Sequence, residues 1–228
     1  MRNIFLASAV LDKYRGQQVT PKLAVRIMRD MESGAFSTVA DTPPPFLPIA
    51  AEEAAAFDRR AGEAFAQDSR LRFMRSTGGM RLEQIVGLMS VYCSEDLRRL
   101  QLLNDDPTPV GVVGYLPEVL GMDKGVSDRL RFLQSEAARL GLPPHGGFGS
   151  VSLLTGVILA DYCRGSDGTW LVPPGEWIST DGQRLYGPTD KVNLGHCTSS
   201  DLGCGYYADF GWPNQGVGGL VWGLFTGS

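Results

Sequence analysis

Residues 126–144 read VSDRLRFLQSEAARLGLPP, and this stretch divides the chain into two parts of different composition. Apolar residues at regular helical spacing form one face of an α-helix. Gly141 stands where a C-terminal helix cap is expected, and the prolines after it prevent the helix from continuing. The stretch therefore predicts a helix over residues 126–140. Its apolar positions are Val126, Leu130, Leu133, Ala137 and Leu140.

Charge and glycine content change at the end of this helix. Residues 1–140 contain 18 basic and 18 acidic residues, whereas residues 141–228 contain 3 basic and 7 acidic residues and carry the whole net charge of −4. The second part also holds 19 of the 29 glycines, all four tryptophans and both histidines. Because glycine suits turns and close backbone contacts, this part predicts short strands and ordered loops. The Ala-, Leu- and Arg-rich first part predicts helices.

Three further helices are expected in the first part. Thr20-Pro21 is a good helix start, since a capping hydroxyl precedes a proline at the first helical position. Apolar residues at helical spacing predict two more helices, over residues 51–74 and 80–100, and the latter places Cys93 in the core. The proline-rich stretch 41–48 predicts an extended connector, and residues 110–116 predict a short apolar strand or a turn.

Strand and turn signals dominate the second part. Residues 157–163 and 169–172 are strand candidates, and Asp181-Gly182 predicts the turn of a hairpin formed by residues 177–180 and 183–186. The expected fold class is α+β, with a helical N-terminal part of about four helices followed by a Gly/Trp-rich region of β-hairpins and loops. The expected domains are a helical scaffold over residues 1–140 and a Gly-rich region over residues 141–228, which can pack as one unit.

Two short segments resemble elements of the lytic transglycosylase family. The first is Glu32-Ser33 with Phe36 close by, and the second is Gly87-Leu88-Met89. The resemblance implies that Glu32 is a general acid and base acting on a glycosidic bond, with its pKa raised by an apolar pocket. The two segments are further apart than in the family, and Ser90 stands where the family has glutamine. A solvated residue at a helix end is the alternative interpretation of Glu32.

Histidine and cysteine positions give weak candidates for a metal site or a nucleophile. Zinc ligands usually come in close pairs such as Cys-x-x-Cys, a spacing that His196, Cys197 and Cys204 do not show. These three residues are weak metal candidates, and no cofactor is expected. Cys163 or Cys197 could form a nucleophile pair with His145, although an inert cysteine is the expected alternative. Cys197 and Cys204 could also pair across a short loop.

The glycine-rich stretch 146–150, Gly-Gly-Phe-Gly-Ser, has neither the lysine nor the preceding strand of a phosphate-binding loop. Phosphate binding is therefore not expected there. Six aromatic residues of the second part are candidates for an interface or a ligand groove, because tryptophan and tyrosine anchor both cores and binding surfaces. They are Trp170, Trp177, Tyr206, Tyr207, Trp212 and Trp222.

Length and composition limit the possible function classes. A chain of 228 residues with 43% hydrophobic residues has the size of one domain or two small ones, and its charge balance excludes a polybasic nucleic-acid binder. No apolar run is long enough for a membrane span. The first nine residues contain too few apolar residues for a signal peptide, so synthesis in the cytoplasm is expected.

The expected function is a structural or assembly protein that acts through contacts with protein subunits, in a homo-oligomer or a larger assembly. A phage virion component such as a head–tail connector or a tail protein has this kind of composition, and incorporation in a virion would follow. The alternatives are a peptidoglycan-degrading enzyme that uses Glu32 and a glycan- or peptide-binding module that uses the C-terminal aromatic residues.

Overall fold

A single seven-stranded sheet organises the described part of the chain. The structure is a computed structural model, and it describes residues 46–164, 169–185, 187–196, 201–208 and 216–227. The strand order is β1-β2-β3-β7-β4-β5-β6, and neighbouring strands are antiparallel except β4 and β7. The elements in chain order are β1 (Phe46–Ile49), α3 (Ala51–Phe57), α4 (Arg59–Gln67), β2 (Arg72–Thr77), α5 (Leu82–Leu88), the 3-10 helix η2 (Ser90–Tyr92), α6 (Glu95–Arg98), β3 (Val110–Leu120), α7 (Val126–Arg139), α8 (Val151–Arg164), β4 (Trp177–Arg184), β5 (Gly187–His196), β6 (Leu202–Ala208) and β7 (Val217–Phe225).

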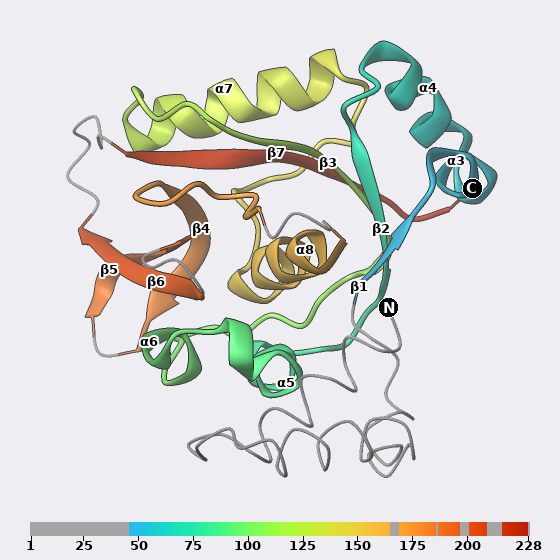
Figure 1. Cartoon of the computed structure of the whole chain (residues 1–228). Helices are drawn as coiled ribbons and strands as arrows, with labels where there is room; N and C mark the ends of the chain where they lie inside the picture. Colours follow the sequence, from blue (N-terminus) through green and yellow to red (C-terminus); the bar gives the residue numbers. More distant parts are fainter. Residues whose placement is uncertain (1–45, 165–168, 186, 197–200, 209–215, 228) are drawn as a thin grey trace, which may run out of the picture.

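The sheet is curved around α8, while α7, α3 and α4 lie on its outer side (Figure 1). Two apolar cores result, one on each face of the sheet. The central strands β3 and β7 contribute to both, because successive side chains of a strand point to opposite faces. Val113 packs in the core around α8, and its neighbour Val112 packs in the core beneath α7. In β7, Trp222 packs in the core around α8, and its neighbour Val221 packs in the core beneath α7.

α8 lies inside the curve of the sheet and is buried along most of its length. Every residue from Val151 to Leu159 is buried, which matches a helix that is apolar on all sides. Gly156 lies against the ring of Phe46 in β1, and a Cβ atom at this glycine would come 1.9 Å from the Cε2 atom of that ring. The fold therefore requires glycine where α8 meets the edge of the sheet.

The one buried carboxylate of α8 is fully engaged. Asp161 is 3% exposed, and it accepts hydrogen bonds from the Arg72 guanidinium at 2.8 and 2.9 Å and from the Tyr115 hydroxyl. A buried charge of this kind is tolerated only when it is paired and hydrogen-bonded. Burial and the neighbouring carboxylate both raise the pKa of Tyr115, so its hydroxyl stays a donor. The three side chains join α8 to β2 and β3.

The expected order of a helical N-terminal part followed by a β-rich part is wrong. Helices alternate with strands along the described chain, and three strands, β1, β2 and β3, come before residue 140. β3 pairs with β7, so residues before and after position 140 share one sheet. Helical periodicity identified amphipathic segments, but the strands β2 and β3 are buried on both faces and lack the alternation that marks a half-buried strand.

Two expected long helices are shorter in the structure. Residues 51–74 form α3 and α4, separated by Asp58, and then enter β2. The Asp58 side chain accepts a hydrogen bond from the Arg60 amide and so starts a new helix. Residues 80–100 form α5, η2 and α6, because Ser94 caps a separate short helix through the Leu97 amide. Gly87-Leu88-Met89 spans the end of α5, and Met89 is buried.

Two strand predictions and a turn prediction are also wrong. Residues 157–163 belong to α8, since an unbroken apolar run gives no periodicity that separates a buried helix from a buried strand. Residues 169–172 form no strand. β4 continues through Asp181-Gly182, which form part of a bulge instead of a hairpin turn, and β4 reaches Arg184 before β5 begins.

Other local predictions are confirmed. Helix α7 covers the expected stretch and ends at Gly141, which has a positive φ of 70°. The Gly141 and Leu142 amides donate to Ala138 and Ala137 carbonyls, the hydrogen bonds of a Schellman cap. Residues 110–116 lie in β3, and Cys93 is 2% exposed. Thr20-Pro21 and residues 41–45 lie outside the described residues, and residues 46–48 are extended in β1.

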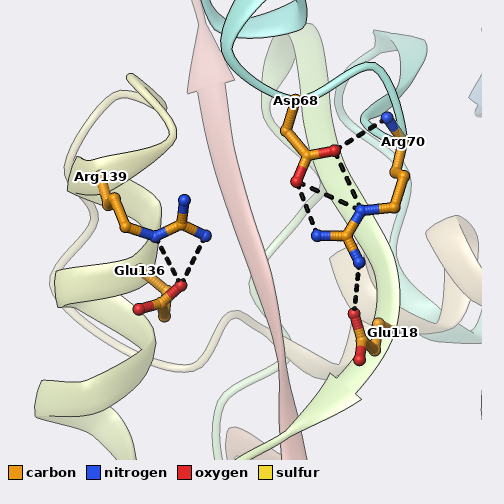
Figure 2. A network of polar contacts seen from close by, with 5 residues as sticks. All are labelled: Asp68, Arg70, Glu118, Glu136 and Arg139. Atoms are coloured by element: carbon orange, nitrogen blue, oxygen red, sulfur yellow. Dashed lines mark hydrogen bonds and ion pairs between the residues drawn. The ribbon is translucent and has the colours of Figure 1, made fainter.

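Exposed arginines form two separate groups of ion pairs, one between the end of α4 and β3 and one within α7 (Figure 2). Arg70 binds the Asp68 carboxylate at 2.7 Å and reaches Glu118 in β3 at 3.2 Å, while Arg139 pairs with Glu136 within α7. The hydrogen bond from Arg70 is the main cause that lowers the pKa of Asp68. Exposed pairs contribute only about 0–1 kcal/mol each. The network therefore fixes side chains at the surface more than it stabilises the fold.

Within the part of the chain that the structure describes, no helix has both the length and the apolar character needed to cross a bilayer.

Replacing Gly156 tests the tight contact between α8 and β1. We expect Gly156→Ala to reduce the free energy of unfolding by about 1–3 kcal/mol through overpacking against Phe46. Gly87→Ala is the matched control, because Gly87 is also helical and a Cβ atom there meets nothing within 4 Å. This control should stabilise the protein by about 0.5–1 kcal/mol. Urea unfolding measures both, and equal effects would contradict the packing described for α8.

Candidate ligand-binding cavity

A loop before α8 and a bulge in β4 hold each other in place. The loop comprises Gly146–Gly149 and is called the glycine loop below. The carboxylate of Asp181 accepts hydrogen bonds from the Phe148 amide at 2.9 Å and the Gly149 amide at 2.8 Å, and the Asp181 amide donates to the Gly149 carbonyl at 2.9 Å. The bulge places Thr180, Asp181 and Gly182 opposite a single residue of β5, Val192. These hydrogen bonds fix the carboxylate in one orientation.

Glycine is required on the loop side of this contact. A Cβ atom on Gly147 would come 2.2 Å from the Oδ2 atom of Asp181. Gly149 has a φ of 111°, which side chains of L-residues rarely allow. The amides of this glycine-rich stretch thus bind an anion, but the anion is a carboxylate of the protein itself.

A cavity of about 230 Å³ lies between α7, the glycine loop, β4 and β5. One wall is apolar and consists of Val126 and Leu130 from α7 together with Phe148. The opposite wall is polar and consists of Ser179, Thr180 and Asn193, which we call the polar wall. The complete lining is Val126, Leu130, Gly146, Gly147, Phe148, Ser179, Thr180, Asp181, Lys191 and Asn193.

Two groups that line the cavity have no partner for their side chains among the residues that the structure describes. Asn193 is 5% exposed, and its side-chain amide makes no hydrogen bond with any residue described by the structure. The Lys191 ammonium likewise forms no ion pair within the described part of the chain. Because buried polar groups are nearly always hydrogen-bonded, an unused amide in a cavity wall indicates a place for water or a ligand.

Arg129 supports the polar wall from behind. This residue of α7 is fully buried, and its Nη1 donates to the Ser179 hydroxyl oxygen at 2.7 Å. Its other nitrogens donate to the carbonyls of Gly121 at 3.1 Å and Lys124 at 2.7 Å, which fixes the turn before α7. Ser179 receives its hydrogen bond from a cation, so its own O–H remains a donor for whatever lies in the cavity. Thr180 instead donates to the Val192 carbonyl at 2.7 Å.

His145 holds the glycine loop from the other side. Its ring stacks on Trp222 with centroids 4.3 Å apart, and its Nδ1 contacts the Gly147 carbonyl. Trp222 donates its indole N–H to the Phe148 carbonyl at 2.8 Å. The His145 Nε2 atom is buried and has no hydrogen-bond partner in the described part of the chain, and burial is the main cause that lowers the pKa of this histidine below 6.5. His145 is therefore a neutral, packed ring at pH 7 that supports the loop.

Most aromatic candidates lie away from this cavity. Trp170 is 7% exposed and stacks on Tyr162, and Trp222 is 8% exposed beneath the glycine loop. Trp177 lies over Gly195 and Gly205 of the next strands, where Cβ atoms would come within 3.1 Å of its ring atoms. These two glycines of β5 and β6 leave room for the indole. The side chains of Tyr206 and Tyr207, and Trp212 entirely, lie outside the described residues.

The other candidates do not form a described site. Glu32 and Cys197 lie outside the described residues, as does the side chain of His196, while Cys204 is 6% exposed in β6. In the described ranges, no three His, Cys, Asp or Glu side chains are grouped as metal ligands would be. Burial raises the pKa of Cys163 to about 11, so this thiol is protonated at neutral pH and is a poor nucleophile.

Comparisons with protein-family models, with curated proteins and with solved structures give no match to this chain. Its function is therefore argued from its own residues.

Sequence reasoning missed the residues that line the cavity. Asp181 is predicted to be a turn residue, and no sequence motif marks Ser179, Lys191 or Asn193 as part of a binding site. The only available signal was the glycine-rich stretch at residues 146–150, which binds Asp181 instead of a phosphate group.

The buried histidine predicts a pH dependence of stability. His145 has a lowered pKa in the folded protein, so its contribution to the free energy of unfolding is complete above pH 6.5. It is lost as the pH falls below that value, because the unfolded chain takes up the proton first. In urea unfolding from about pH 8 to pH 5, the decrease in stability should be smaller in His145→Phe, which keeps an aromatic ring against Trp222. His196→Phe is the control for the other histidine. Equal slopes in wild type and His145→Phe would contradict this role.

Proposed function

We propose that this chain is a small-molecule-binding protein and that its ligand occupies the cavity between α7, the glycine loop and strands β4 and β5. The observation that carries the proposal is the Asn193 side-chain amide, which is nearly buried in the cavity wall and has no partner among the described residues. A small ligand would satisfy this amide and lie against the apolar wall opposite. Pockets with mostly apolar walls and a few convergent polar groups are the usual form of small-molecule sites.

The lining favours binding over catalysis. It contains no histidine, cysteine or glutamate, and two of its groups that could act as a base or a nucleophile are engaged by the protein, Asp181 by the glycine loop and Thr180 by the Val192 carbonyl. Its carboxylate, Asp181, is held in one orientation by two backbone amides. The cavity is also smaller than the roughly 300–1,000 Å³ of drug-sized sites, so it fits a ligand of the size of an amino acid or a monosaccharide.

A thermal-shift screen tests the proposal with a defined panel of free amino acids, monosaccharides and short carboxylic acids. At least one compound should raise the melting temperature of the wild type. Asn193→Leu should weaken that compound about tenfold, the loss expected for one hydrogen bond to an otherwise unpaired group. Asn104→Leu, in an exposed loop, is the matched control and should bind as the wild type does. A panel without any hit, or hits unaffected by Asn193→Leu, would refute the proposal.

Assembly through subunit contacts is the second candidate function, and two exposed leucines favour it. Residues 101–103 pair with the end of β4 through hydrogen bonds from the Leu103 amide to Gln183 and from the Leu185 amide to Gln101. Leu103 and Leu185 therefore lie on the same face of this pairing, 45% and 42% exposed. We propose that a second copy of the chain covers them, with a virion component as one form of such an assembly.

Light scattering coupled to gel filtration tests the assembly role. The wild type should be larger than a monomer, and Leu103→Ser with Leu185→Ser should shift it toward the monomer. Val110→Ser is the control, because Val110 is 69% exposed, more than any other large apolar residue that the structure describes, and lies elsewhere, at the start of β3. A wild-type monomer at high concentration would rule out self-assembly.

A further inference from the structure

Two opposite charges line the cavity without forming an ion pair with each other. Asp181 belongs to β4 and Lys191 to the neighbouring strand β5, and both are part of the lining. No ion pair joins them, and Lys191 has no other acidic partner among the described residues. A ligand with a single charge would use only one of the two. A ligand with an anionic and a cationic group would use both.

The anionic side of the cavity is rigid. Each carboxylate oxygen of Asp181 accepts one backbone amide of the glycine loop, and a carboxylate oxygen has lone pairs for a second donor. An ammonium group in the cavity can therefore bind Asp181 without displacing the loop. Hydrogen bonds between charged groups are about twice as strong as neutral ones, which makes this contact selective for a cation.

The cationic side offers three donors. Lys191 supplies an ammonium group, Asn193 supplies an amide N–H, and Ser179 supplies an O–H whose oxygen already accepts from Arg129. The buried Arg129 guanidinium behind Ser179 adds positive charge to this side. A carboxylate is the small group that fits several donors next to a cation.

The remaining wall specifies the rest of the ligand. Val126, Leu130 and Phe148 offer only apolar surface from their side chains, and burying one aliphatic side chain against such a wall contributes about 1.5–3 kcal/mol. From these three features we propose that the ligand is a free α-amino acid with an aliphatic side chain, its ammonium group on Asp181 and its carboxylate on Lys191, Asn193 and Ser179. This inference rests on the proposed function, since it names the ligand class of the same cavity.

Isothermal titration calorimetry with L-leucine and two analogues tests the ligand class without any substitution. The analogues are 4-methylpentanoate, which lacks the ammonium group, and 3-methylbutylamine, which lacks the carboxylate. We expect L-leucine to bind and each analogue to bind at least tenfold more weakly, because each loses one charged contact. An analogue that binds as tightly as L-leucine, or the absence of binding for L-leucine, L-isoleucine and L-valine alike, would overturn the inference.

Substitutions then assign the two ends of the ligand. Asp181→Asn should weaken L-leucine and 3-methylbutylamine, which both place an ammonium group on Asp181, at least tenfold more than it weakens 4-methylpentanoate, because only the last lacks that contact; Lys191→Met should weaken L-leucine and 4-methylpentanoate more than 3-methylbutylamine. Asp106→Asn, an exposed carboxylate away from the cavity, is the control. If both substitutions affect all three compounds equally, the assignment of the ends is wrong.

Failure of this inference and failure of the proposed function give different results. A monosaccharide or short carboxylic acid that binds in an Asn193-dependent manner, with no binding of aliphatic amino acids, would keep the binding role and overturn only the ligand class. If no compound in the panel binds, both the ligand class and the proposed binding function are wrong.

Discussion

The contact between the Asp181 carboxylate and the glycine loop is the interaction on which the site depends. It joins a bulge of β4 to the segment that leads into α8, two parts of the chain that are 32 and 33 residues apart in the hydrogen bonds concerned. A carboxylate bound by backbone amides needs close approach, and Gly147 allows it because any Cβ atom would collide with Asp181. The bulge that results turns Ser179 and Asp181 toward one space and creates the cavity beside α7.

A second carboxylate performs a comparable task at the far end of α8. Asp161 is bound by Arg72 and Tyr115, and it fixes the end of the helix to β2 and β3. Each end of this buried helix is therefore tied to the sheet through an aspartate, one on the helix and one on β4. The Asp161–Arg72 ion pair contributes little net stability but strongly disfavours arrangements that leave the buried Asp161 charge unpaired. Together with the hydrogen bonds from the glycine loop to the exposed Asp181, it specifies how the apolar helix is placed inside the curve of the sheet.

The cavity brings together polar groups that the protein already uses and polar groups that it leaves open. Arg129 and Thr180 are engaged by the protein itself. At the cavity, Asn193 and Lys191 keep hydrogen-bonding capacity that no described residue uses. Polar side chains that keep open hydrogen-bonding capacity toward a cavity are expected of residues retained for binding. Because one wall of the cavity is apolar and another is polar, a ligand would bind there in a preferred orientation.

Local signals in the sequence determined the elements with strong caps and periodicity. The helix α7 and its end at Gly141 followed from apolar spacing and a glycine cap, and β3 followed from its apolar run. The apolar run of α8 was ambiguous, and Asp181-Gly182 has the chemistry of a turn, although tertiary contacts place it inside β4. Only the tertiary structure decided that Asp181 binds the glycine loop and that Asn193 lines a cavity, because both depend on contacts between residues distant in sequence.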